Sequence, residues 1–178
     1  MRHMLIVLGI CLAAIVVGAA LYFYGPPELR ETQVLSGTEA SALNADPAVS
    51  VSFTVLAEGT NASGVSKRKN YAVYTEEDFT RLWTMAYGTD TSAMPSIDFD
   101  TQYVIGVFAG EKPTGGHTIE VASITDASSV RTVSMSLTRP GEGCMTSQAL
   151  TSPFQLIAVP VSDRELARSE TEVVAACQ

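Results

Sequence analysis

Residues 4–24 form an uninterrupted run of uncharged, mostly apolar residues near the amino terminus. A helix needs about 20 such residues to cross the hydrocarbon core of a bilayer, so this run is long enough to span one. It ends in Tyr22, Phe23 and Tyr24, and aromatic side chains are enriched at the membrane interface. Arg2 and the amino group place positive charge before the run, which favours a cytoplasmic amino terminus. We therefore predict a single-pass protein of the cell membrane with its main domain on the extracytoplasmic side.

Two other interpretations of this segment stay open. A cleaved signal peptide is the first, because Gly18, Ala19 and Ala20 are small residues suited to a processing site. A lipoprotein attached through Cys11 is the second, although the bulky Ile10 precedes this cysteine. With either an anchor or a cleaved signal, the main domain works outside the cytoplasm.

Charge and residue counts exclude several classes of function. The 178 residues contain 11 Lys and Arg, 19 Asp and Glu, and a formal net charge of −8 at pH 7. A surface this acidic repels nucleic acid and anionic lipid. The two His and three Cys show no C-x-x-C or H-x-x-x-H spacing, which excludes most zinc and iron–sulfur sites. We expect no nucleic-acid partner, no metal and no cofactor.

The composition changes sharply after the apolar run. A Gly-Pro-Pro sequence at residues 25–27 ends any helix, because proline cannot continue the hydrogen-bond ladder. The residues up to about position 47 are rich in Glu, Ser, Thr, Ala and Gly, a composition typical of a tether. We predict a membrane anchor at residues 1–24, a flexible tether at 25–47 and a folded domain at 48–178.

Hydrophobic patterning in the folded domain predicts mostly strands and one main helix. Thr75 suits the cap of a helix that runs to Tyr87, since acidic residues fill its first turn and Gly88 follows it. Residues 103–109 are apolar almost throughout, which favours a central strand buried on both faces. In total about seven strands are expected, near residues 49–55, 71–74, 103–109, 117–124, 130–137, 154–159 and 172–176, with a helical turn at 162–168. These elements predict an α+β domain built on mainly antiparallel sheet.

The segment Lys112, Pro113, Thr114, Gly115 and Gly116 is a predicted turn between two strands. Its adjacent glycines permit positive φ and can bring backbone amides to the surface. The simplest interpretation is a hairpin whose geometry demands glycine, and the alternative is a loop that presents its backbone to a partner chain. The Gly-Lys-Ser/Thr ending of a phosphate loop is missing. We take these five residues and the following histidine as candidate partner-binding residues.

His117 is the histidine that follows this turn, and the leader contains the other one. A histidine acting as general base needs a nucleophile and an orienting carboxylate. Cys144 or Ser152 could be the nucleophile and Asp126 the orienting group, but no nucleophile motif supports them. We expect no catalytic residues, and a hydrolase that uses His117 is the least favoured hypothesis.

Cys144 and Cys177 are the two cysteines outside the leader. An even number of cysteines outside the cytoplasm favours a disulfide, which would attach the carboxyl end to the loop at Cys144. A closed loop of this length corresponds to roughly 3–4 kcal/mol in the chain-entropy model. Two free thiols or an intermolecular bond are the alternatives.

Three ordered motifs resemble the carboxy-terminal domain of the PrcB family, named after a subunit of a bacterial surface protease complex. They are the segment 104–121 with its Pro-Thr-Gly-Gly-His, Arg-Pro-Gly-Glu-Gly-Cys at 139–144, and Gln-Ala-Leu-Thr-Ser-Pro-Phe at 148–154. His117 stands where the family usually has Tyr, and Phe154 stands for a second Tyr. The resemblance covers roughly residues 68–161 and implies a non-enzymatic accessory module attached to a membrane or envelope.

These features together support one hypothesis and two alternatives. The hypothesis is a bacterial, anchored domain that binds another envelope protein to stabilise or regulate a surface protease complex. The first alternative is a direct protease inhibitor that inserts the 112–116 loop, by analogy with the Pro-Thr-Thr-Gly-Tyr loop of chagasin-like inhibitors. The second is the hydrolase dependent on His117.

Overall fold

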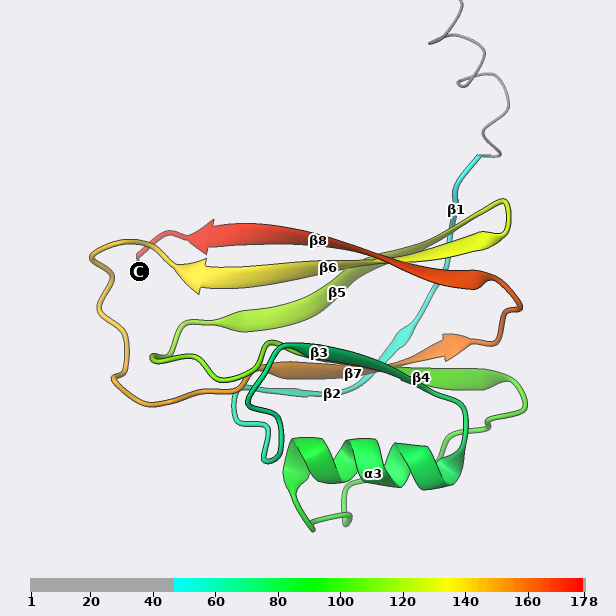
Figure 1. Ribbon diagram of the computed structural model, residues 1–178, viewed down its shortest axis with the longest axis horizontal. Coiled ribbons are helices and arrows are strands. Elements are labelled where there is room, and N and C mark those ends of the chain that lie inside the picture. The colour runs from blue at the N-terminus through cyan, green and yellow to red at the C-terminus, as the bar shows by residue number, and fades with distance from the viewer. Residues whose placement is uncertain (1–46, 178) are drawn as a thin grey trace, which may run out of the picture. The chain divides into compact units, whose positions relative to one another are not determined.

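The computed structural model describes residues 47–177, which form two β-sheets and one helix (Figure 1). The predicted membrane anchor at residues 1–24 and almost all of the predicted tether lie outside the described residues. Within residues 47–177, no helix is both long enough and apolar enough to span a membrane. The anchor therefore stays a prediction from the sequence.

Each sheet contains four strands. One sheet, here called the β8 sheet, has the spatial order β1 (Val49–Ser50), β5 (Thr118–Ala127), β6 (Val130–Pro140) and β8 (Glu165–Ala175). The other, here called the β3 sheet, has the order β2 (Thr54–Gly59), β7 (Phe154–Pro160), β4 (Gln102–Phe108) and β3 (Lys69–Val73). All pairings are antiparallel except β6 with β8, which is parallel. The predicted α+β fold with mainly antiparallel sheet is confirmed, with eight strands in the described range instead of about seven.

Two predictions about local structure are wrong. Residues 49–55, expected as one strand, contribute β1 to one sheet and the start of β2 to the other. Residues 162–168 do not form a helical turn, because β8 begins at Glu165 and pairs with β6 along its whole length. Pairing with a strand distant in sequence decides the conformation here, and the local pattern does not contain that information.

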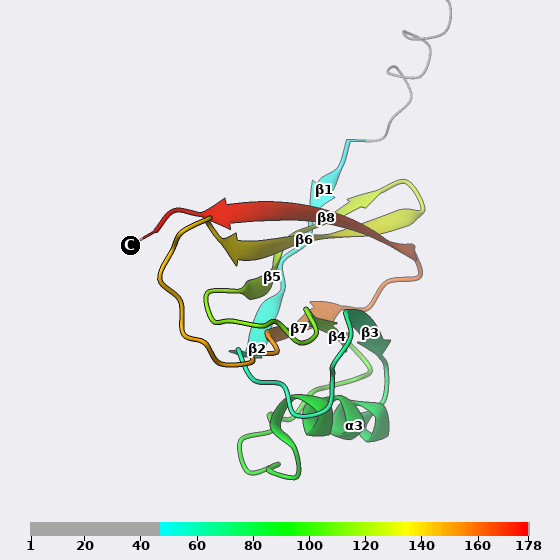
Figure 2. The same cartoon turned by 60° about the vertical axis from the view of Figure 1, so that its left-hand side comes forward.

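Helix α3 (Glu76–Tyr87) begins and ends where the sequence predicts. The side chain of Thr75 accepts a hydrogen bond from the backbone N–H of Asp78, and acidic residues occupy the first turn. Gly88 follows the helix with φ of +70°, a conformation that favours glycine. The buried face consists of Phe79, Leu82, Trp83 and Ala86. This face covers the outer side of the β3 sheet (Figure 2).

Strand β4 separates two hydrophobic cores. Side chains alternate between the two faces of a strand. Tyr103, Ile105 and Val107 lie in the core between the sheets, whereas Val104 and Phe108 pack with the helix. All five side chains are at most 5% exposed. The prediction of a central strand buried on both faces is confirmed.

A buried glutamine connects the two sheets. The pairing of β5 with β6 shifts register between Val121 and Ser123, which marks a β-bulge. Gln155 of β7 accepts a hydrogen bond from the N–H of Val121 at 2.8 Å through its Oε1 atom. Its Nε2 atom donates to Glu58 at 3.2 Å. The side chain therefore satisfies a buried backbone amide beside the bulge, where an unpaired group would be costly.

Replacing Gln155 with Leu should lower the free energy of unfolding by about 1–3 kcal/mol, because the buried N–H of Val121 loses its acceptor. Gln148 is exposed and contacts only a neighbouring carbonyl, so Gln148→Leu is the matched control and should change stability by less than about 0.5 kcal/mol. Urea unfolding followed by the fluorescence of Trp83 measures both variants. Equal stabilities would contradict the linking role of Gln155.

Candidate functional site

The loop at residues 112–116 leads from β4 to β5 and so passes from one sheet to the other. The prediction of a hairpin is wrong, because the two strands of a hairpin are neighbours in one sheet. Glycine is nevertheless required at the second position of the pair. Gly116 has φ of +81°, which side chains rarely adopt.

Gly115 packs closely against the loop at residues 141–153. A Cβ atom at this position would lie 2.4 Å from the hydroxyl oxygen of Ser147. The N–H of Gly115 donates to the carbonyl of Ser147 at 2.9 Å. The N–H of Gly115 is therefore not open to a partner chain, since another loop of the same domain already accepts its hydrogen bond.

The three sequence motifs meet at one end of the sandwich. The backbone N–H and C=O of Lys112 bond the C=O and N–H of Thr151 at 2.7 and 3.0 Å. The hydroxyl of Thr151 also donates to the carbonyl of Thr114 at 2.9 Å. Pro140 lies beside the glycine pair, since a Cβ at Gly116 would approach its ring to 3.4 Å. We call the two segments that meet here, residues 110–117 and 141–153, the loop end.

A disulfide between Cys144 and Cys177 ties the loop end to the end of the chain. Their Cα atoms are 5.1 Å apart. Next to this bond, the N–H of Gly141 donates to the carbonyl of Ala175 at 3.0 Å. The loop that follows β6 is therefore held against the last residues of β8.

Two large apolar side chains project from the loop end. Met145 is fully exposed and Leu150 is 65% exposed. They lie in the segment without helix or strand that is hydrogen-bonded to residues 112–116, where Pro113 and Gly116 are also exposed. Methionine and leucine presented on a constrained loop are suited to contact with another protein.

His117 lies directly before β5 and is half-buried. It lines a small hollow together with Lys112 and Arg139. Burial, and then the charges of these two cations, lower the pKa of His117 below its ordinary value. The imidazole is therefore neutral at pH 7.

The residues of the hydrolase hypothesis do not form a catalytic arrangement. The sulfur of Cys144 is bonded to Cys177 and is no free nucleophile. Ser152 is 6% exposed, and its hydroxyl donates to the carbonyl of Val65 at 2.9 Å. Residues 47–177 also contain no group of three His, Cys, Asp or Glu side chains that could hold a metal ion.

Asp126 belongs to an ion pair at the far end of β5 from His117. The Nε and Nη2 atoms of Arg131 donate to its two carboxylate oxygens at 2.7 and 2.9 Å. These hydrogen bonds lower the pKa of Asp126 below its ordinary value of 3.8. Strand β5 rises about 3.3 Å per residue over its length, so this carboxylate cannot orient the histidine at the other end.

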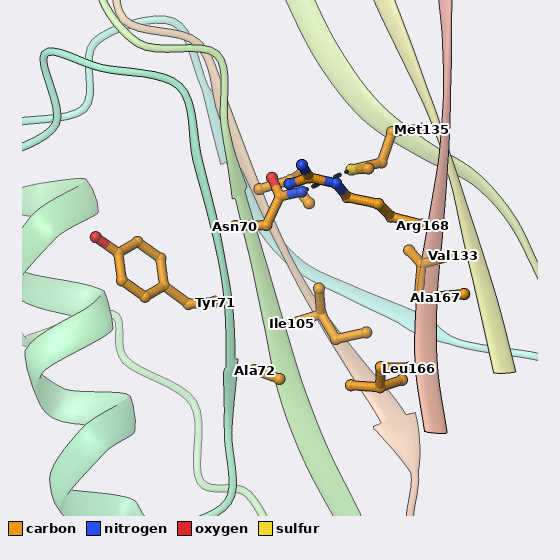
Figure 3. A pocket seen from close by; sticks show the side chains of 10 residues that line it. Asn70, Tyr71, Ala72, Ile105, Val133, Met135, Leu166, Ala167 and Arg168 are labelled. Atoms are coloured by element: carbon orange, nitrogen blue, oxygen red, sulfur yellow. Dashed lines mark hydrogen bonds between the residues drawn. The ribbon is translucent and has the colours of Figure 1, made fainter. Parts of the chain in front are cut away.

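A cavity of about 330 Å³ lies between the two sheets, where β3 and β8 form their edges (Figure 3). Its lining includes the core residues Ile105, Val107, Val133 and Met135. The edge strands contribute Asn70, Ala72, Leu166 and Arg168. Because the inward residues of β3 are small and the side chain at 168 is exposed, neither edge strand seals the sandwich. No sequence motif marks this cavity. The residues of β8 that line it fall in the segment 162–168, for which the sequence predicts a helical turn.

The family model described as PrcB C-terminal matches residues 103–160. The match extends from β4 through β7 and contains all three motifs that meet at the loop end. It confirms the resemblance to the PrcB family. Neither a curated protein nor a solved structure matches the chain.

Replacing Gly115 with Ala should lower the free energy of unfolding by about 1 kcal/mol, because the new methyl group overlaps the hydroxyl of Ser147 and this side chain must rotate away. Adding Ser147→Ala to this variant should restore most of the loss, since the remaining Cβ is at an ordinary distance of 3.6 Å. Thermal unfolding measures the three proteins. Gly64→Ala is the matched control, because its Cβ meets no atom closer than 3.6 Å. Failure of the second substitution to restore stability would contradict this packing.

Replacing Asp126 with Asn should lower the free energy of unfolding at pH 7 by about 3 kcal/mol, because the buried Arg131 loses its charge partner. The pKa of Asp126 is lowered by folding, so its stabilisation is complete above about pH 5 and is lost as pH falls through the unfolded and then the lowered pKa. The difference between wild type and variant should therefore narrow from pH 5 to pH 2 in urea unfolding. The exposed Asp163→Asn is the control, and a constant difference for Asp126→Asn would contradict the pairing.

Proposed function

We propose that this chain is a membrane-anchored, extracytoplasmic accessory module that binds another envelope protein and stabilises or regulates a surface protease complex. The match of residues 103–160 to PrcB C-terminal suggests a module associated with a protease complex. The observation that carries the proposal is the loop end, where two loops hold each other and expose Met145 and Leu150.

The two loops of the loop end are already ordered before a partner binds. Hydrogen bonds join Lys112 to Thr151 and Gly115 to Ser147, and the disulfide at Cys144 holds the second loop. A surface fixed in advance loses less conformational entropy on association. The candidate residues at positions 112–117 would therefore act as a rigid support beside the exposed apolar side chains.

The proposed location rests on two observations. The uncharged residues 4–24 are long enough to span a bilayer. The bond between Cys144 and Cys177 suits an oxidising compartment, since disulfides rarely persist in the cytoplasm. In this arrangement residues 25–47 hold the domain away from the membrane surface.

Direct protease inhibition by insertion of the 112–116 loop is less well supported. Inserted inhibitor loops need backbone groups that are open to the protease. Here Gly115 is buried, and the backbone groups of Lys112 already pair with Thr151. The geometry favours a docking surface over a loop that enters a cleft.

Site-specific cross-linking in the native cells tests the proposed function. A photoreactive amino acid at position 150 of the full chain should capture one dominant envelope protein, either a protease or a subunit of a protease complex. With the photoreactive group kept there, Met145→Asp should reduce the captured amount at least tenfold, because a charge disrupts an apolar contact. The partner is identified by mass spectrometry.

Two controls accompany this experiment. The photoreactive group at position 81, on the exposed side of α3, should capture no such protein. Val161→Asp introduces the same charge at an exposed apolar residue outside the loop end and should leave capture unchanged. Capture at position 150 no higher than at 81, or equal effects of the two Asp variants, would contradict the proposal.

A further inference from the structure

Strand β3 is the edge strand best able to accept another strand. An edge strand offers unpaired backbone N–H and C=O groups, and proteins block most edges with bulges, charges or short strands. β1 has two residues, and the pairing of β2 shifts register between Val55 and Ala57. β8 carries the four charged residues Glu165, Arg168, Glu170 and Glu172, whereas β3 carries one, Lys69. β3 instead pairs with β4 in an unbroken register, and among residues 47–177 no strand pairs with its other side.

Hollows flank β3 on both faces of its sheet. The apolar cavity of about 330 Å³ lies on the inner face, beneath β8. A smaller hollow of about 120 Å³ is lined by Lys67, Lys69 and Tyr71, among others. Figure 3 shows Tyr71 pointing toward α3, away from the side of β3 where Ala72 and Ile105 line the apolar cavity. A strand added beside β3 would therefore place alternate side chains toward an apolar cavity and a basic hollow.

The unpaired positive charges of the described domain gather around these hollows. Residues 47–177 contain nine Lys and Arg, and five of them form ion pairs with Asp or Glu: Arg68, Arg81, Arg131, Arg139 and Arg164. The other four are Lys67, Lys69, Arg168 and Lys112, of which the first three line the hollows beside β3. In a chain with a net charge of −8, this local excess of positive charge favours an acidic partner.

Arg68 holds the walls of the apolar cavity in place. Its Nη1 atom donates to the carbonyl of Phe108 at 3.0 Å, and its Nη2 atom pairs with Glu170 of β8 at 2.6 Å. The same guanidinium contacts the sulfur of Met135, which lines the cavity. The side chain of Arg68 thus links the β3 sheet to β8 across the mouth of the cavity. The cavity is therefore open before any partner binds.

We propose that β3 accepts an extended acidic segment of a partner protein as the fifth strand of the β3 sheet. Backbone hydrogen bonds to the free edge supply affinity, as in other cases of strand addition. Apolar side chains of the segment enter the cavity beneath β8, and its carboxylates, on the opposite face of the added strand, lie near Lys67 and Lys69. This surface is distinct from the loop end, so the proposal goes beyond the proposed function and does not depend on it.

Labelled peptides added to the full chain test this proposal. The full chain is kept in solution with a nonionic detergent because of its apolar residues 4–24. One decapeptide alternates glutamate with valine, and its control alternates lysine with valine. Fluorescence anisotropy should show at least tenfold tighter binding of the acidic peptide, because both carry the same apolar side chains and differ in charge.

Charge reversals on the protein locate the binding site. Lys67→Glu and Lys69→Glu should each weaken binding of the acidic peptide about tenfold. Arg81→Glu makes the same change of charge on the exposed side of α3 and should leave binding unchanged. Equal affinity for acidic and basic peptides, no binding of the acidic peptide, or equal effects of all three reversals would overturn the proposal.

Methylation of the peptide backbone separates strand addition from simple apolar binding. One version carries N-methyl groups on its odd-numbered amides and another on its even-numbered amides. Only the amides that face β3 donate to it, so one version should lose binding and the other should keep it. Equal binding of both versions, or displacement by decanoate without any effect of methylation, would overturn strand addition in favour of an amphipathic small ligand.

Discussion

Burial of both faces of the β3 sheet is the constraint on which the rest of the domain depends. Strands β4 and β7 are apolar on both faces, so each face needs its own cover. Helix α3 covers one face with Phe79, Leu82 and Trp83, and the β8 sheet covers the other with Ile124 and Met135. The chain has to pass between the two sheets to build these layers, and these passages create the loop end.

The two surfaces on which the proposals rest lie at one end of the two sheets and along their β3 and β8 edges. At the loop end, connections between the sheets pack on each other and leave Met145 and Leu150 in solvent. Along the β3 and β8 edges, small or charged inward residues such as Ala72 and Arg168 leave a cavity open. Both surfaces suit protein contacts, and they lie on different parts of the domain. The two proposals therefore assign one partner to the loop end and another to strand pairing on the same domain.

The predicted helix caps and the predicted central strand, which depend on neighbouring residues, agree with the structure, whereas two predictions that ignored distant partners are wrong. Thr75 and Gly88 bound the helix as expected, because capping acts within a few residues. Residues 103–109 form a central strand, because a continuous apolar run must be buried. The predictions for residues 162–168 and for the turn at 112–116 are wrong. The first segment pairs with β6, and the second packs on the loop at 141–153.

The sequence by itself determined the helix with its caps, the buried central strand, the mainly antiparallel α+β class and the three motifs of the PrcB resemblance. Only the tertiary structure decided that these motifs meet at one end, that Gly115 serves packing against Ser147, and that an apolar cavity opens beside β3. The physical reason is the range of the interactions. Caps and hydrophobic periodicity act over a few residues, whereas strand order and the contacts between loops join segments that only the folded chain brings together.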